Sequence, residues 1–175
     1  MILKGFKEKS IKKQLNLILK SPNNSFEESP IKKMGIIFNA DESIDFEGLK
    51  SLNNVVGVKP NKLKVIAFTP KNKEVTYSWD TCFNPKDFSW NGKVINTELQ
   101  TFIDTNFDIL ISFYTQDILE LRYITAASKA KFKVGVYQQD ERLNDLIIKT
   151  NLNQLESFKT ELHKYLKVLN KIQHD

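Results

Sequence analysis

The sequence is poor in the residues that build most recognisable active sites. Among 175 residues it has one cysteine (Cys82), two histidines and six glycines. A lone cysteine excludes an internal disulfide. The two histidines of the chain are eleven residues apart and match no zinc-binding spacing. No glycines form the GxGxxG or GxxxxGKS/T phosphate-binding loops. We therefore expect no catalytic residue, no metal site and no cofactor, and a cysteine nucleophile at Cys82 is disfavoured because neither histidine can be placed beside it.

Long apolar runs are also missing. No window approaches the roughly 18 apolar residues of a membrane span. Lysines begin directly after Met1-Ile2-Leu3, which leaves no apolar core for a secretory signal. Together with the single cysteine, these features predict a cytoplasmic protein.

The excess of positive over negative charge lies at one end of the chain. Residues 1–33 hold eight lysines and three acids, which accounts for the whole net charge of +5. The remainder carries equal numbers of basic and acidic side chains. Only Arg122 and Arg142 are arginines, and arginine is the residue that reads bases bidentately. We therefore expect no sequence-specific DNA binding.

The basic end predicts an amphipathic helix over residues 1–20, joined by a linker at 21–33 that contains two prolines. Its lysines are candidate partner-binding residues: Lys4, Lys7, Lys12 and Lys13. Three interpretations remain open: a solvated face, a site for a partner protein, or a site for an anionic membrane or RNA. The apolar stripe (Leu3, Phe6, Ile11, Leu15, Ile18) either covers one face of the domain's sheet or leaves the helix detached for association.

Residues 34–175 predict a single α/β domain. Four short apolar runs have the pattern of strands buried on both faces: 34–39, 63–69, 107–113 and 132–137. A fifth strand is expected at 146–148. Helical patterns alternate with them, and the one at 117–130, capped by Asp117, is apolar on most sides. This alternation predicts a Rossmann-like, three-layer fold with a mostly parallel sheet, helices on both faces, and Ile109 and Ile111 nearly fully buried.

A different pattern interrupts the domain at about residues 70–96. Val75, Tyr77 and Trp79 alternate as in an edge strand, and Asn91-Gly92 is typical of a hairpin turn. The aromatic residues of this β-hairpin-like insertion either stack on a ligand or, as we favour, form a small satellite core.

Polar residues follow the predicted strands, where open α/β sheets bind their ligands. The candidate ligand-binding residues are Asn39, Asp41, Thr69, Thr115, Gln116 and Gln138. The competing interpretation is that such loops are polar anyway, and that Asp41 and Ser43 cap the next helix.

Two resemblances are carried by the stretch Phe107-Asp-Ile-Leu-Ile-Ser-Phe, the helix ending Ala126-Ala-Ser-Lys-Ala, and the strand Lys131-Phe-Lys-Val-Gly-Val. With Phe88-Ser-Trp-Asn-Gly-Lys upstream, most of residues 34–170 resembles an uncharacterised family of short proteins from flavobacteria and their relatives, which implies bacterial origin and no assigned activity. The core stretch is also similar to the N-terminal Rossmann-like half of heptosyltransferase-type glycosyltransferases. The second domain of those enzymes is missing, so no catalytic residue is carried over.

These observations favour a non-catalytic accessory or binding module that acts through a protein partner. The alternative is a small-molecule or nucleotide(-sugar)-binding domain, or a small enzyme, that uses the loops at the strand carboxyl ends. A deep polar pocket in those loops would favour the alternative, and an exposed apolar surface would favour the binding module.

Overall fold

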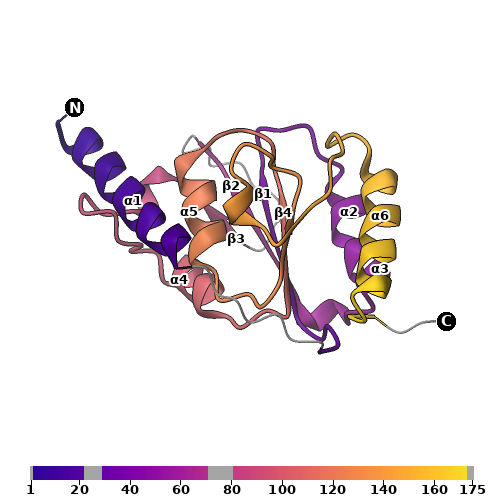
Figure 1. Cartoon of the computed structure of the whole chain (residues 1–175). Coiled ribbons are helices and arrows are strands. Elements are labelled where there is room, and N and C mark those ends of the chain that lie inside the picture. Colours follow the sequence, from indigo (N-terminus) through magenta and orange to yellow (C-terminus); the bar gives the residue numbers. More distant parts are fainter. Residues whose placement is uncertain (1, 22–28, 71–80, 173–175) are drawn as a thin grey trace.

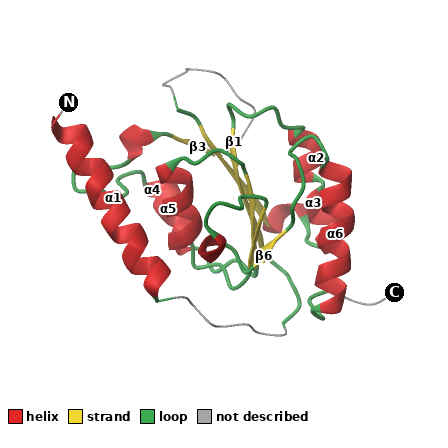
Figure 2. Cartoon of the chain, turned by 45° about the horizontal axis from the view of Figure 1, so that its top comes forward, coloured by secondary structure: helices red, strands yellow, loops and turns green. Residues whose placement is uncertain are grey.

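The computed structural model describes residues 2–21, 29–70 and 81–172, and within them one parallel sheet lies between two layers of helices (Figures 1 and 2). The strands are β1 (Met34–Asn39), β2 (Leu63–Phe68), β3 (Thr81–Phe83), β4 (Ile109–Phe113), β5 (Lys133–Gly135) and β6 (Leu146–Ile147). The α-helices are α1 (Ile2–Lys20), α2 (Phe46–Lys50), α3 (Leu52–Val56), α4 (Thr97–Asp104), α5 (Leu119–Ala127) and α6 (Leu155–Val168). Three short 3₁₀ helices are η1 (Pro60–Lys62), η2 (Pro85–Asp87) and η3 (Glu141–Leu143). The predicted Rossmann-like α/β fold is confirmed.

The order of strands in the sheet is β3-β2-β1-β4-β5-β6, and every pairing is parallel. The chain builds the sheet outward from β1 in one direction and then from β4 in the other. Connections that leave β1 and β4 therefore run to opposite faces, and a crevice opens between the carboxyl ends of these two strands. This switch-point crevice is where the topology predicts a ligand.

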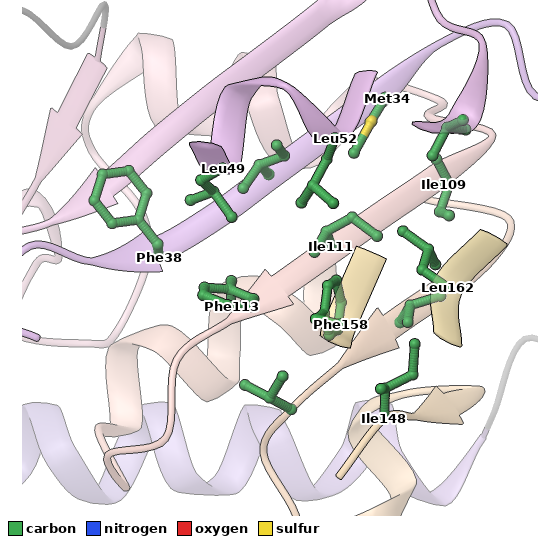
Figure 3. Packing of buried hydrophobic residues seen from close by; sticks show 14 of the residues in the cluster. Met34, Phe38, Leu49, Leu52, Ile109, Ile111, Phe113, Ile148, Phe158 and Leu162 are labelled. Atoms are coloured by element: carbon green, nitrogen blue, oxygen red, sulfur yellow. The ribbon is translucent and has the colours of Figure 1, made fainter. Parts of the chain in front are cut away.

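Apolar side chains cover both faces of the central strands. β1 and β4 are buried along their whole length, which explains why their sequences are continuous apolar runs. On one face, Ile109 and Ile111 pack with Phe158 and Leu162 of α6 (Figure 3). Neither isoleucine is exposed at all, as predicted.

On the other face, α5 is covered on two sides. Leu121 and Ile124 belong to the core beneath the sheet, and α1 packs on the outer surface of the same helix (Figure 1). A helix enclosed in this way needs apolar residues around most of its circumference, which is the pattern that residues 117–130 show.

Only the second half of α1 takes part in this packing. Ile11, Leu15 and Leu19 are buried, whereas Leu3 and Phe6 are 67% and 58% exposed. The alternative in which the whole stripe covers the sheet does not hold, because α1 lies on α5 and its first turns extend past that contact (Figure 1).

The predicted hairpin turn is present between Phe88 and Val94, which form an antiparallel bridge. Gly92 has a φ of +79°, a conformation that residues with a side chain rarely adopt. A Cβ atom there would lie 3.0 Å from the backbone nitrogen of Ile11, so the turn packs directly on α1. The hairpin thereby joins α1 to the domain.

Several local predictions need correction. β3 was not predicted, and the expected strand at Val75–Trp79 lies outside the described residues. Asp117 does not cap α5, whose N-cap position is Ile118 without a side-chain bond. Asp45, rather than Asp41 or Ser43, caps α2 by accepting a hydrogen bond from the backbone of Gly48.

Candidate functional site

Four of the predicted ligand-binding residues meet at the switch-point crevice. Asn39, at the end of β1, is fully buried and donates from Nδ2 to Oε1 of Gln116 at 3.0 Å. Its Oδ1 accepts a hydrogen bond from the backbone nitrogen of Asp41 at 3.1 Å. The amide of Asn39 thus joins the loop after β1 to the loop after β4.

A second bridge crosses the same crevice through Glu42, which sequence reasoning missed. The backbone nitrogen of Thr115 donates to both carboxylate oxygens of Glu42, at 3.0 and 3.2 Å, and the Thr115 hydroxyl donates to one of them. A carboxylate of the chain itself therefore accepts the hydrogen bonds that a ligand would need. An open depression remains beside it, lined by Glu42, Ser43, Thr115, Asn151, Leu152 and Asn153.

The other two predicted residues lie elsewhere along the carboxyl edge of the sheet. Thr69 is buried after β2, and its backbone nitrogen and its hydroxyl both donate to the carbonyl oxygen of Phe83 in β3. Gln138 is exposed after β5. The structure brings Asn39, Asp41, Thr115 and Gln116 together and leaves Thr69 and Gln138 apart from them.

Both arginines are used within the fold, next to the end of β5. Arg122 contacts the carboxylates of Asp117 and Asp140 at 3.2 and 3.1 Å, and Arg142 contacts Asp140 at 2.9 Å. Hydrogen bonds from Arg142 lower the pKa of the Asp140 carboxyl. Burial, with a further contribution from Asp117, raises the pKa of Tyr137 to about 12. This network consists of ion pairs between side chains of the chain itself.

A different kind of surface lies on the first half of α1. Leu3 and Phe6 are exposed there, and Trp90 of the hairpin, 66% exposed, lies beside them. Single exposed apolar side chains are ordinary, but a contiguous group that includes a tryptophan is typical of an interaction site. We call this group, with the lysines described next, the α1–Trp90 patch.

Lysines surround the apolar part of the α1–Trp90 patch. Two shallow grooves flank Trp90. One is lined by Leu3, Lys4, Lys7, Phe88 and Trp90, and the other by Phe6, Lys9, Ser10, Lys13, Trp90 and Asn91. Three of the predicted partner-binding lysines, at positions 4, 7 and 13, therefore belong to the patch. Lys12 is exposed but lines neither groove.

The two elements of the patch are fixed to each other. The side chains of Ser10 and Gln14 both donate to the carbonyl oxygen of Asn91, next to Trp90. Gln14 also accepts a hydrogen bond from the Tyr123 hydroxyl of α5 at 3.0 Å. Lys7 donates from Nζ to the carbonyl oxygen of Pro85 at 2.7 Å. The patch is therefore a surface built from parts of the chain that are distant in sequence.

Sequence reasoning placed the aromatic insertion correctly but did not separate its members. Phe83 and Phe88 are buried, but they belong to the main core on the α5 side of the sheet and not to a separate satellite core, whereas Trp90 is exposed. Tyr77 and Trp79 lie outside the described residues. The Asn-Gly pair after Trp90 was the signal in the sequence for the exposure of this tryptophan, because a residue directly before a tight hairpin turn is commonly at the surface.

Comparison with known proteins gives a family but no activity. The model of a family of unknown function, DUF6913, matches residues 7–169, which include most of α1. No curated protein and no solved structure matches significantly. Among the described residues, no helix is long and apolar enough to cross a membrane, and no three His, Cys, Asp or Glu side chains are grouped as metal ligands.

Proposed function

We propose that the chain, which belongs to the DUF6913 family of unknown function, is a non-catalytic binding module that acts through a protein partner at the α1–Trp90 patch. The observation that carries the proposal is the contiguous exposure of Leu3, Phe6 and Trp90 within a surrounding group of lysines. Aromatic side chains are enriched at the centres of protein interfaces, where they supply much of the binding energy.

The charge of the patch indicates the chemistry of the partner. Lys4, Lys7, Lys9 and Lys13 line its grooves, and no acidic side chain of the described residues does. A second copy of this chain would bring lysines against lysines, which disfavours a symmetric dimer through this surface. An acidic surface with apolar side chains fits the patch in both charge and hydrophobicity.

The alternative function, a ligand site or small enzyme at the strand carboxyl ends, has less support. The Glu42 carboxylate and the Asn39–Gln116 bond already bridge the switch-point crevice. The acids at positions 41 and 42 would also repel a nucleotide phosphate. A bacterial origin, a cytoplasmic location and the similarity to heptosyltransferase-type enzymes stay predictions.

Site-specific photo-crosslinking in the native cell tests the proposal. A photoreactive phenylalanine analogue replaces Trp90 in one variant and Val168 in another. Val168, on α6 at the opposite side of the molecule, is 72% exposed and gives a control of equal accessibility (Figure 1). We expect discrete protein adducts from position 90 and none of the same adducts from position 168.

A double variant, Phe6→Ser with Trp90→Ser, provides the functional control. Both side chains are largely exposed, so the free energy of unfolding should change by no more than about 0.5 kcal/mol per site. With the photoreactive analogue placed at a third position, Lys4, the adducts seen in the otherwise unchanged chain should disappear in the double variant. Lipid or RNA adducts at position 90 would contradict a protein partner and favour the anionic-surface alternative. Identical adducts from positions 90 and 168 would reject the patch.

A further inference from the structure

A second group of cationic side chains lines a cavity outside the α1–Trp90 patch. A cleft of about 360 Å³ opens where the C-terminal ends of α1 and α5 meet the start of β5 and the segment from η3 to β6. The apolar side chains of its lining that matter below are Leu19, Ala127 and Leu143. The volume lies at the lower end of the range for small-molecule sites.

The walls of this lysine cleft combine cations with small apolar side chains. Lys129, Lys131, Lys133 and Arg142 contribute four positive charges, and Asp145 is the one carboxylate that the described residues place in the lining. Three of these cations contact carboxylates that do not line the cleft: Asp104, Asp108 and Asp140. Three of the four cations are thus paired, and the lining combines these charged side chains with leucine, isoleucine and alanine.

Lys133 is the exception among the four cations. Its Nζ donates to the carbonyl oxygen of Ala126 at 2.9 Å, at the C-terminal end of α5. It takes part in none of the ion pairs formed between described residues. Burial lowers the pKa of Lys133 to about 8, against the opposing effect of Asp145. A partly buried ammonium that forms no ion pair with another described residue is unfavourable, and such groups are common at binding sites.

We propose that the lysine cleft binds a small organic anion, with its carboxylate or phosphate group between Lys133 and Arg142 and its apolar body against Leu19, Ala127 and Leu143. The anion would accept a direct charged hydrogen bond from Lys133, whose Nζ forms no ion pair with another described residue. The proposal goes beyond the protein-partner function, because it concerns a different surface and a different class of ligand. Lys129 and Lys131 at the rim favour entry of a negatively charged molecule.

Titration of the full ¹⁵N-labelled chain with phenyl phosphate, followed by NMR and calorimetry, tests this site. Phenyl phosphate carries both an anionic group and an apolar body. We expect saturable shift changes confined to residues 18–21, 126–133 and 142–145. Inorganic phosphate and phenol, which each supply half of the ligand, should bind at least about tenfold more weakly.

Three substitutions separate the site from general attraction to lysine. Lys133→Gln and Arg142→Gln should each weaken phenyl phosphate by about tenfold or more, the loss typical of one charged hydrogen bond. Lys62→Gln removes an exposed lysine of η1 outside the cleft and should leave the affinity unchanged. Arg142 is half-exposed, so its variant remains informative if Lys133→Gln impairs folding.

Four results would overturn the proposal. They are a dissociation constant weaker than about 10 mM, shift changes scattered over surface lysines, equal affinity in all three variants, or equal affinity for inorganic phosphate. Because the α1–Trp90 patch does not contribute to the cleft, none of these results bears on the protein-partner function.

Discussion

Replacing Leu15 by alanine tests whether α1 is part of the folded domain or a detachable arm. Leu15 is 2% exposed in the contact between α1 and α5, and its neighbours in that contact, Ile11 and Leu19, are buried too. Truncating a leucine in such a position removes its transfer free energy and leaves a cavity. The measured range for this change is about 2–5 kcal/mol.

The same helix provides a matched control. Leu17 lies two residues further on and is 58% exposed, so Leu17→Ala makes the same chemical change with the same effect on helix propensity. It should alter the free energy of unfolding by about 0.5 kcal/mol or less. The difference between the two variants therefore measures burial in the α1–α5 contact alone.

Urea unfolding, followed by circular dichroism and by tryptophan fluorescence, supplies the measurement. With a slope of about 1–3 kcal/mol per molar urea, Leu15→Ala should lower the midpoint by about 1–2 M and Leu17→Ala by a few tenths. The transitions should coincide for both signals, because Trp90 is attached to α1. Equal midpoints for the two variants, or an early separate transition of helical signal, would refute this reasoning and restore the detached arm.

Three further predictions follow from single contacts. Ile111→Ala should cost about 2–5 kcal/mol by urea unfolding, and a loss below about 1 kcal/mol would mean that β4 is not central. Gly135→Ala should destabilise the fold by about 1–3 kcal/mol, because the added Cβ would lie 2.4 Å from Nδ2 of Asn144. Adding Asn144→Ala to this variant should recover part of the lost stability. Strictly additive effects of the two substitutions would contradict the clash. Burial lowers the pKa of Lys133 from 10.5 to about 8, so between these pH values the unfolded state binds more protons than the folded state. The free energy of unfolding of the wild type should therefore rise relative to that of Lys133→Met by up to about 3 kcal/mol from pH 8 to 10.5. Parallel pH profiles of the two proteins would exclude this.

The central part of the fold was predictable because its residues experience the same environment on both sides. Ile109 and Ile111 lie in a strand covered by helices on each face, so a short apolar run without alternation was a sufficient signal. The apolar circumference of α5 likewise predicted burial. It did not reveal that α1 provides the outer cover, since many arrangements enclose a helix equally well.

Features that depend on contacts distant in sequence were not predictable. Glu42 lies in a loop that looks like an ordinary acidic turn, and its role appears only when Thr115, 73 residues away, is placed beside it. β3 has only three residues and owes its conformation to pairing with β2. Asp117 is of a residue type that commonly caps helices, but its carboxylate forms an ion pair with Arg122 instead.

The lysine cleft shows the same limit for charge. Lys129, Lys131 and Lys133 alternate along the sequence and look like the solvated residues that precede an edge strand. Their different environments arise because α5 ends at Ala127 and brings its last carbonyl groups over the start of β5. Sequence spacing gives the number of charges, whereas the path of the helix decides which one is buried.

The division of α1 into a buried half and an exposed half also explains why its patch is suited to binding. Ile11, Leu15 and Leu19 fix the second half against α5, and one helix cannot change direction between its halves without breaking backbone hydrogen bonds. The first half therefore holds Leu3 and Phe6 in a set orientation, and the bonds from Ser10 and Gln14 to Asn91 hold the hairpin beside them. A surface ordered before the partner arrives loses less conformational entropy on binding, so its few apolar side chains contribute more to affinity than the same residues on a free arm. Folding of the second half and recognition by the first are thus properties of a single helix.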